Sequence, residues 1–202
     1  MKRSSCVALL FFVAVILAAP GILAQMPEPF SADYTHTTPQ KDMIAGKIFF
    51  SAPKMRIEMN RGGREMAIIF DQSTRTTLML MPQQRMYMEF HADQTNPMAG
   101  QVPRPPMALD ANHPCPTGAT CGKQGTETVN GRVCDKWVSK DGDGTTTLWI
   151  DQKLHFPVKS QNPGGETWEL RNVKEGRPDS SVFEVPPGYQ KLDPGNLGQR
   201  PR

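Results

Sequence analysis

Residues 76–90 read TTLMLMPQQRMYMEF, and the alternation of apolar residues around a proline turn predicts a β-hairpin. Four methionines, Met79, Met81, Met86 and Met88, lie two apart on the two sides of the turn. Side chains two apart on a strand share a face, so a turn of two or four residues puts all four on one face, whereas three residues would split the pairs. Three interpretations of such a face are open: an ordinary core, a pocket for an apolar ligand, or a soft-metal site.

The rest of the chain repeats this pattern of short strands and turns. Asn130-Gly131 is the dipeptide most typical of a tight hairpin, and residues 64–71 are apolar on both faces, as in a covered central strand. We expect ten or eleven antiparallel strands, and therefore a mainly β fold: a sandwich, a barrel, or an unclosed barrel with a plug or lid. Besides the methionine hairpin, the predicted strands are 30–38, 46–51, 54–59, 64–71, 125–129, 132–139, 145–151, 156–161 and 166–173, and a short apolar segment at 182–185 ends the fold.

The first residues have the pattern of a secretory signal peptide. Lys2 and Arg3 precede an apolar run over 7–19, and small residues follow, so we expect cleavage after residue 24 and export of the protein. Removal of this segment leaves 21 basic and 20 acidic residues, a formal charge of +1. A nearly neutral chain without a basic block does not indicate nucleic-acid binding.

The remaining chain suits a single β domain over 25–192. Its longest connection, 93–124, is rich in proline and is expected to form a loop or lid with at most short helical turns. Residues 193–202 have no apolar pattern and are expected to be a disordered tail.

Three cysteines remain after export: Cys115, Cys121 and Cys134. An oxidising compartment favours one disulfide and one free thiol. The short spacing favours Cys115–Cys121, and Cys121–Cys134 is the alternative. A zinc site formed by these cysteines and His113 is a further alternative, but the spacing matches no common zinc framework.

No catalytic motif is present in the sequence. The histidines lack a zinc-protease pattern, and there is neither a nucleophile elbow nor a glycine-rich phosphate loop. We therefore assign no catalytic or metal residue and expect a protein that is not an enzyme and needs no cofactor.

The methionines suggest a ligand-binding face instead. Methionine is flexible and adaptable, which suits a surface that accepts variable apolar partners better than a uniquely packed core. The residues expected to line the concave sheet and bind ligand are Met55, Ile57, Met59, Met79, Met81, Met86 and Met88. Copper(I) binding through the Met-x-Met pairs, with His91 as a further ligand, is an alternative because thioethers bind soft metals.

The order of segments resembles exported bacterial proteins of the LolA/LppX-like superfamily, in an uncharacterised branch described as a domain of unknown function. The resemblance covers about residues 30–192, and its most specific parts are WID at 149–151, FPVK at 156–159 and FEVPPGYQ at 183–190. It implies an unclosed β-barrel of about eleven strands, with short helices over a hydrophobic concavity. It also implies a periplasmic protein that binds lipid or the acyl chains of lipoproteins.

The proline-rich segment 93–124 departs from the more helical connections of dedicated carriers. A sensor or scaffold, or an envelope interaction module that binds a partner protein without lipid, therefore stays open beside the carrier. We expect a monomer.

Overall fold

The computed structural model describes residues 27–91, 114, 118–142 and 144–192. The predicted signal peptide, the predicted tail and most of the proline-rich connection, with its expected helical turns and lid, lie outside these residues. None of the described helices, each a single 3-10 turn, is long and apolar enough to cross a membrane.

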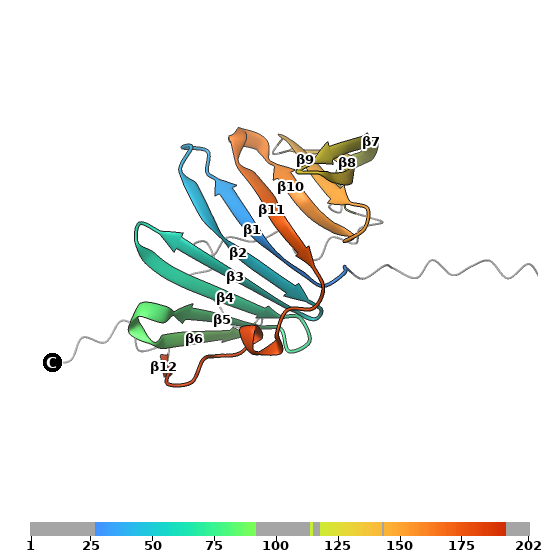
Figure 1. The fold of residues 1–202 in the computed structure, drawn as a ribbon. Coiled ribbons are helices and arrows are strands. Elements are labelled where there is room, and N and C mark those ends of the chain that lie inside the picture. Colours follow the sequence, from blue (N-terminus) through green and yellow to red (C-terminus); the bar gives the residue numbers. More distant parts are fainter. Residues whose placement is uncertain (1–26, 92–113, 115–117, 143, 193–202) are drawn as a thin grey trace, which may run out of the picture.

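Twelve strands form one open sheet in the order β12-β6-β5-β4-β3-β2-β1-β11-β10-β9-β8-β7 (Figure 1). All neighbours are antiparallel except β12 and β6, and the predicted unclosed half-barrel is confirmed. The strands are β1 (Phe30–Thr37), β2 (Met43–Ser51), β3 (Lys54–Arg61), β4 (Arg64–Asp71), β5 (Thr76–Met81), β6 (Met86–His91), β7 (Thr120–Val129), β8 (Arg132–Asp141), β9 (Gly144–Asp151), β10 (Phe156–Gln161), β11 (Thr167–Glu175) and β12 (Gln190–Leu192).

Local turn chemistry sets the strand register at two hairpins. Asn130 and Gly131 have φ angles of 48° and 78°, the left-handed pair that a primed two-residue turn requires, and they join β7 to β8 as predicted. Between β5 and β6 the chain forms the 3-10 turn η1 (Pro82–Gln84), followed by Arg85 with a φ of 51°. This turn has four residues, so it keeps the methionines of both strands on one face.

Contacts between aromatic rings identify the concave face of the sheet. The rings of Phe50 on β2 and Phe156 on β10 have centroids 5.5 Å apart, although β1 and β11 lie between the two strands. Neighbouring strands are about 4.8 Å apart, so side chains can meet across two intervening strands only where the sheet curls toward them. Phe30 on β1 contacts both rings and completes the cluster. We call this concave face the inner face and the opposite one the outer face.

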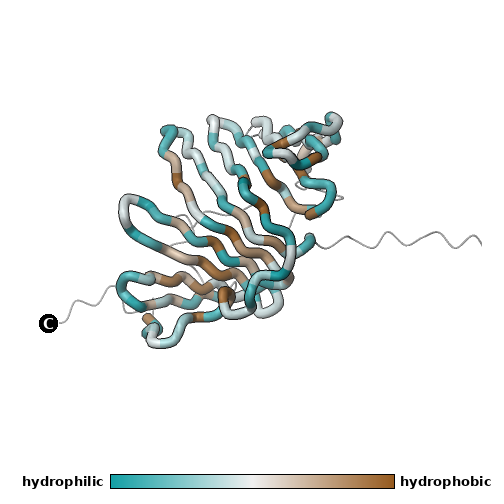
Figure 2. Tube along the Cα trace, viewed as in Figure 1, coloured by the Kyte–Doolittle hydropathy of each residue, from teal (hydrophilic) through white to brown (hydrophobic). Residues whose placement is uncertain are grey.

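The C-terminal segment covers the outer face of β3 to β5. It contains the 3-10 turn η3 (Ser180–Phe183), and Phe183 packs in an apolar cluster with Ala67, Ile69 and Leu80. Buried residues lie on both faces of β4, with Ala67 and Ile69 on the outer face and Ile68 on the inner face, so the strand is apolar on both sides, as its sequence predicts. Figure 2 shows the hydrophobic residues gathered over these neighbouring strands.

The short apolar segment at 182–185 forms no strand, because it crosses the sheet and has no strand beside it to pair with. Its backbone amide and carbonyl groups form hydrogen bonds with side chains instead. The Asp179 side chain accepts one from the amide of Ser181, and Arg56 donates one to the carbonyl of Val182 at 3.0 Å. Pairing resumes only at β12, which lies parallel to β6 and begins with a hydrogen bond from the Gln190 amide to the Arg85 carbonyl.

A buried carboxylate joins β9 to the strands and turn around it. Asp151, which is 2% exposed, accepts two hydrogen bonds from the guanidinium of Arg132, at 2.5 and 3.2 Å. It also accepts hydrogen bonds from the amides of Lys153 and Leu154, which fixes the turn toward β10. Arg132 in turn donates to Glu175 on β11 at 2.9 Å, so this side chain links three strands.

We expect Asp151→Ala to lower the free energy of unfolding by about 3 kcal/mol, because the largely buried guanidinium and two turn amides lose their acceptor. Urea denaturation followed by tryptophan fluorescence measures the change. Asp135→Ala, which removes a partly exposed ion pair with Lys123, is the control and should cost less than about 1 kcal/mol. Equal effects of the two substitutions would contradict a central role for Asp151.

Candidate functional site on the inner face

The inner face of β3 to β6 is a continuous apolar surface built by four neighbouring strands. Alternation along each strand and the register between strands place three or four residues of each strand on this face, and Arg61 and Arg64, exposed at the β3–β4 turn, form its rim. Thr77 is the one polar residue within that rim. We call this surface the methionine face; its residues are Met55, Ile57, Met59, Met66, Ile68, Phe70, Thr77, Met79, Met81, Met86, Met88 and Phe90.

The register confirms that the four hairpin methionines share one face. Met79 lies opposite Met88, and Met81 lies opposite Met86. The predicted lining residues Met55, Ile57 and Met59 continue the same face on β3, where Ile57 pairs with Ile68 and Ile68 pairs with Met79. The seven residues named from the sequence therefore occupy one surface.

Exposure varies along the strands of this surface. Met55, Ile57, Met79 and Met88 are between 1% and 3% exposed, whereas Met81 and Met86, beside the hairpin turn, are half-buried. The turn end therefore offers flexible side chains partly in contact with solvent, and the middle is closed from it. The side chains at this turn end can change rotamer at low energetic cost, because methionine has three rotatable side-chain bonds and no branch.

Sequence reasoning missed Met66, Tyr34 and Gly46. Met66 pairs with Met59, but β4 is apolar on both faces, so its alternation does not show which face each residue occupies. Tyr34 pairs with Gly46, and Gly46 pairs with Met59, so one cross-strand row continues from the methionines to β1. Only the pairing of the strands reveals this row.

The structure does not support His91 as a ligand beside the methionines. Met88 and Phe90 point to the inner face, whereas Glu89 and His91 belong to the alternate set on the outer face. The His91 ring lies 3.4 Å from the Glu89 carboxylate and 3.4 Å from the Thr76 hydroxyl. The described residues contain no group of three or more His, Cys, Asp or Glu side chains that could hold a metal ion.

Cys134 excludes one of the two disulfides considered from the sequence, because it is a free thiol with no exposed surface. The Cys121–Cys134 pairing is therefore wrong, because Cys134 lies in the core cluster with Trp149 and Phe156. The Cys115–Cys121 pairing and the zinc alternative stay predictions, since Cys115 and His113 lie outside the described residues.

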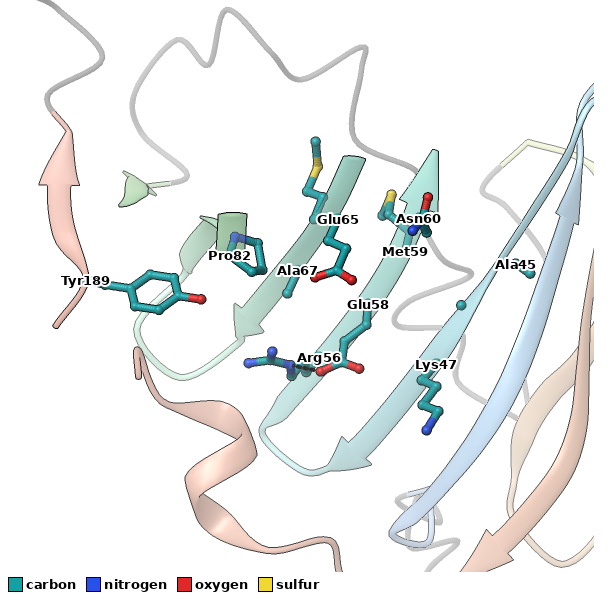
Figure 3. Close-up of a pocket in the computed structure, with 12 residues that line it drawn as sticks. Ala45, Lys47, Arg56, Glu58, Met59, Asn60, Glu65, Ala67, Pro82 and Tyr189 are labelled. Carbon is teal, nitrogen blue, oxygen red and sulfur yellow. Dashed lines mark hydrogen bonds and ion pairs between the residues drawn. The ribbon is translucent and has the colours of Figure 1, made fainter. Parts of the chain in front are cut away.

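Two pockets on the outer face lie on either side of the C-terminal segment. One, of about 380 Å³, is drawn in Figure 3: Lys47, Arg56, Glu58 and Glu65 surround it, and Tyr189 lies at its side. Arg56 donates a hydrogen bond to Glu58 at 2.9 Å. The other, of about 500 Å³, has Phe183 and Val185 in its wall and Lys54 3.7 Å from Asp71 at its rim. The first pocket has two basic and two acidic side chains, and the second pairs Lys54 with Asp71, so neither indicates a charged ligand.

Comparison with solved structures gives the class of fold. An uncharacterized conserved protein from Thermus thermophilus superposes with a TM-score of 0.55 at 10% identity, over 82% of this chain and 90% of that one. MucB, in the MucA/MucB complex of Pseudomonas aeruginosa, superposes with a TM-score of 0.51 at 16% identity, over 79% of this chain and 56% of that one. This chain therefore spans about half of MucB. A comparison with curated protein sequences found no match.

These likenesses show a shared fold, an open β half-barrel, which is the fold that the resemblance in the sequence implies. Residues 33–155 match the family described as "Domain of unknown function (DUF4412)". The chain belongs to this family.

The exposures of the methionines predict the order in which they oxidise. Met43, which is 71% exposed, should form sulfoxide first in dilute hydrogen peroxide, Met81 and Met86 next, and Met55, Met79 and Met88 last. Tandem mass spectrometry of tryptic peptides over a time course separates these sites. Oxidation of Met79 or Met88 as fast as Met43 would contradict the placement of the methionine face.

Burial also predicts an unreactive thiol. Desolvation raises the pKa of Cys134 to about 11, so at pH 8 only about a thousandth of it is thiolate, the reactive form. Iodoacetamide should leave Cys134 unmodified in the native protein at pH 8 and should label it rapidly in 6 M guanidinium. Fast labelling without denaturant would show that this core region opens readily.

Proposed function

We propose that this protein is a periplasmic, non-enzymatic binder of a hydrophobic ligand, a lipid or the acyl chain of a lipoprotein, on the methionine face. The observation that carries the proposal is the composition of that face: seven methionines among the twelve residues inside the rim of Arg61 and Arg64, with one threonine as the polar member. The fold class, which is that of binding and carrier proteins, supports it.

The energetics favour an acyl ligand. Burying a chain of twelve methylenes contributes about 10 kcal/mol at about 0.8 kcal/mol per methylene, before the costs of association and ordering. This exceeds the lower estimates of those costs, so a purely apolar face can bind such a chain without a charged contact. Methionine side chains can also fit acyl chains of different length and branching, which a carrier requires.

Native mass spectrometry of protein purified gently from its own envelope, followed by solvent extraction, tests this proposal. A stoichiometric adduct that extracts as lipid or lipopeptide is the expected result. A bare polypeptide that also fails to bind added fluorescent fatty acid would overturn the proposal.

Met81→Gln combined with Met86→Gln should weaken the binding of a fluorescent fatty acid about tenfold, because polar amides replace the apolar side chains at the half-buried end of the face. Met43→Gln, at an exposed position, is the matched control and should leave binding unchanged. Fluorescence titration measures all three proteins. Equal affinities of the three proteins would show that the ligand does not contact this end of the methionine face.

The cross-strand pairs Met79–Met88 and Met81–Met86 also favour one alternative, copper(I) held by thioethers. Anaerobic titration with copper(I) against a competing chelator separates the two functions. Binding tighter than micromolar that the double glutamine variant loses would favour copper.

The likeness to MucB, which was solved in complex with MucA(peri), favours a second alternative, a protein partner in the envelope. Recovery of one stoichiometric partner protein with a lipid-free sheet would support that function over lipid binding.

A further inference from the structure

The hydroxyl group of Tyr34 is buried on the inner face of β1. Tyr34 is 2% exposed, and its Oη atom has no hydrogen-bond partner among the described residues. Burial raises the pKa of this hydroxyl to about 12, so it stays protonated and can donate a hydrogen bond. Phenylalanine would fill the same space without burying an unpaired polar atom, so a tyrosine here points to a partner that the described residues do not supply.

The ring of Tyr34 occupies the space over Gly46, on the side of β1 that faces the methionines. Gly46 lies opposite Tyr34 on β2, and a Cβ atom on Gly46 would be 2.7 Å from Cε1 of the tyrosine ring. The ring therefore leans across β2 into the space that the glycine leaves. Met59 is the next residue in the same cross-strand row, so the polar end of Tyr34 lies at the border of the apolar surface.

A second buried polar atom lies on the same strand. His36 is two residues along β1, on the same face, and its buried Nδ1 atom has no partner in the part of the chain that the structure describes. Its Nε2 atom lies 2.6 Å from the Glu166 carboxylate, and a carboxylate accepts a hydrogen bond, so the proton is on Nε2. In the neutral ring Nδ1 is then an acceptor. One donor and one acceptor are thus adjacent on the strand that borders the methionine face.

We propose that Tyr34, with His36 beside it, holds the uncharged polar head of the ligand, an ester or amide that links an acyl chain to the rest of the molecule. The Tyr34 hydroxyl donates to the carbonyl oxygen, and the acyl chain lies over Met59 and the methionines beyond it. His36 accepts a hydrogen bond from an amide N–H or a hydroxyl group of the same head. This inference rests on the proposed function, because it places the head of a ligand whose chain occupies the methionine face.

The surroundings favour an uncharged head over a carboxylate. The residues that share a cross-strand row with Tyr34, Gly46 and Met59, carry no charge. Arg61, which the alternation of β3 places on the same face, is exposed at the β3–β4 turn, and the His36 ring is hydrogen-bonded to Glu166. A carboxylate placed here would lose its hydration and gain no countercharge, whereas a carbonyl needs only the donor that Tyr34 provides.

The test compares three ligands of matched chain length as competitors for a fluorescent fatty acid probe: methyl dodecanoate, dodecanoate and tridecane. Wild-type protein should bind methyl dodecanoate about five- to tenfold more tightly than tridecane, the difference expected for one hydrogen bond. In Tyr34→Phe the affinity for the ester should fall to that for the hydrocarbon, and the affinity for the hydrocarbon should not change. Tyr189→Phe, which removes a tyrosine hydroxyl on the outer face, should behave as wild type.

The outcomes separate this inference from the function on which it rests. Displacement of the probe by neither the ester nor tridecane would overturn hydrophobic-ligand binding itself. Displacement by both, with no loss of ester affinity in Tyr34→Phe, would support hydrophobic-ligand binding and overturn the role of Tyr34. The Tyr34 hydroxyl would then be hydrogen-bonded to water. Tighter binding of dodecanoate than of the ester would overturn the uncharged head. A urea transition of Tyr34→Phe at or above that of wild type confirms that the variant is folded.

Discussion

The curvature of the sheet depends on aromatic side chains that meet across it. Phe30, Phe50 and Phe156 come from strands that are not all neighbours, and their ring centroids lie between 5.0 and 5.8 Å apart. A flat sheet would separate β2 from β10 by three strand spacings, so these contacts require the sheet to curl. The curl gives the molecule an inner face, and the strands that extend beyond the aromatic cluster, β3 to β6, carry that face outward as an apolar surface. Without the cluster the methionines would lie on a sheet with no defined concavity.

Much of this arrangement can be predicted from the sequence, because the strands alternate clearly and the turns have distinctive residues. Asn130-Gly131 specifies its hairpin, and the four residues from Pro82 to Arg85 keep the methionines of β5 and β6 together. His91 could have been assigned to the opposite face by the same alternation from Met88, so its proposed role beside the methionines overlooked a pattern that was available.

Other features depend on partners that are distant in the sequence. The segment at 182–185 has the composition of a strand, but it forms a 3-10 turn and crosses the outer face, because Phe183 fits the apolar cluster there and no strand edge is beside it. Tyr34 and Gly46 are ordinary residues until the register of β1 and β2 places them opposite each other. The polar border of the candidate site is therefore visible only in the folded chain.

The two ends of the sheet protect its edges in different ways. At one end, β7 has exposed lysine and glutamate side chains and an irregular register between Lys123 and Gly125, which makes it a poor template for another strand. At the other end, β6 has the sequence MYMEFH, whose apolar residues and free backbone groups would readily pair with a strand of another molecule. The three residues of β12 occupy that edge, and Lys191 forms an ion pair with Glu89 across it. This short strand therefore protects the protein against self-association through its most apolar edge, and any event that releases it turns a stable sheet into a seed for aggregation.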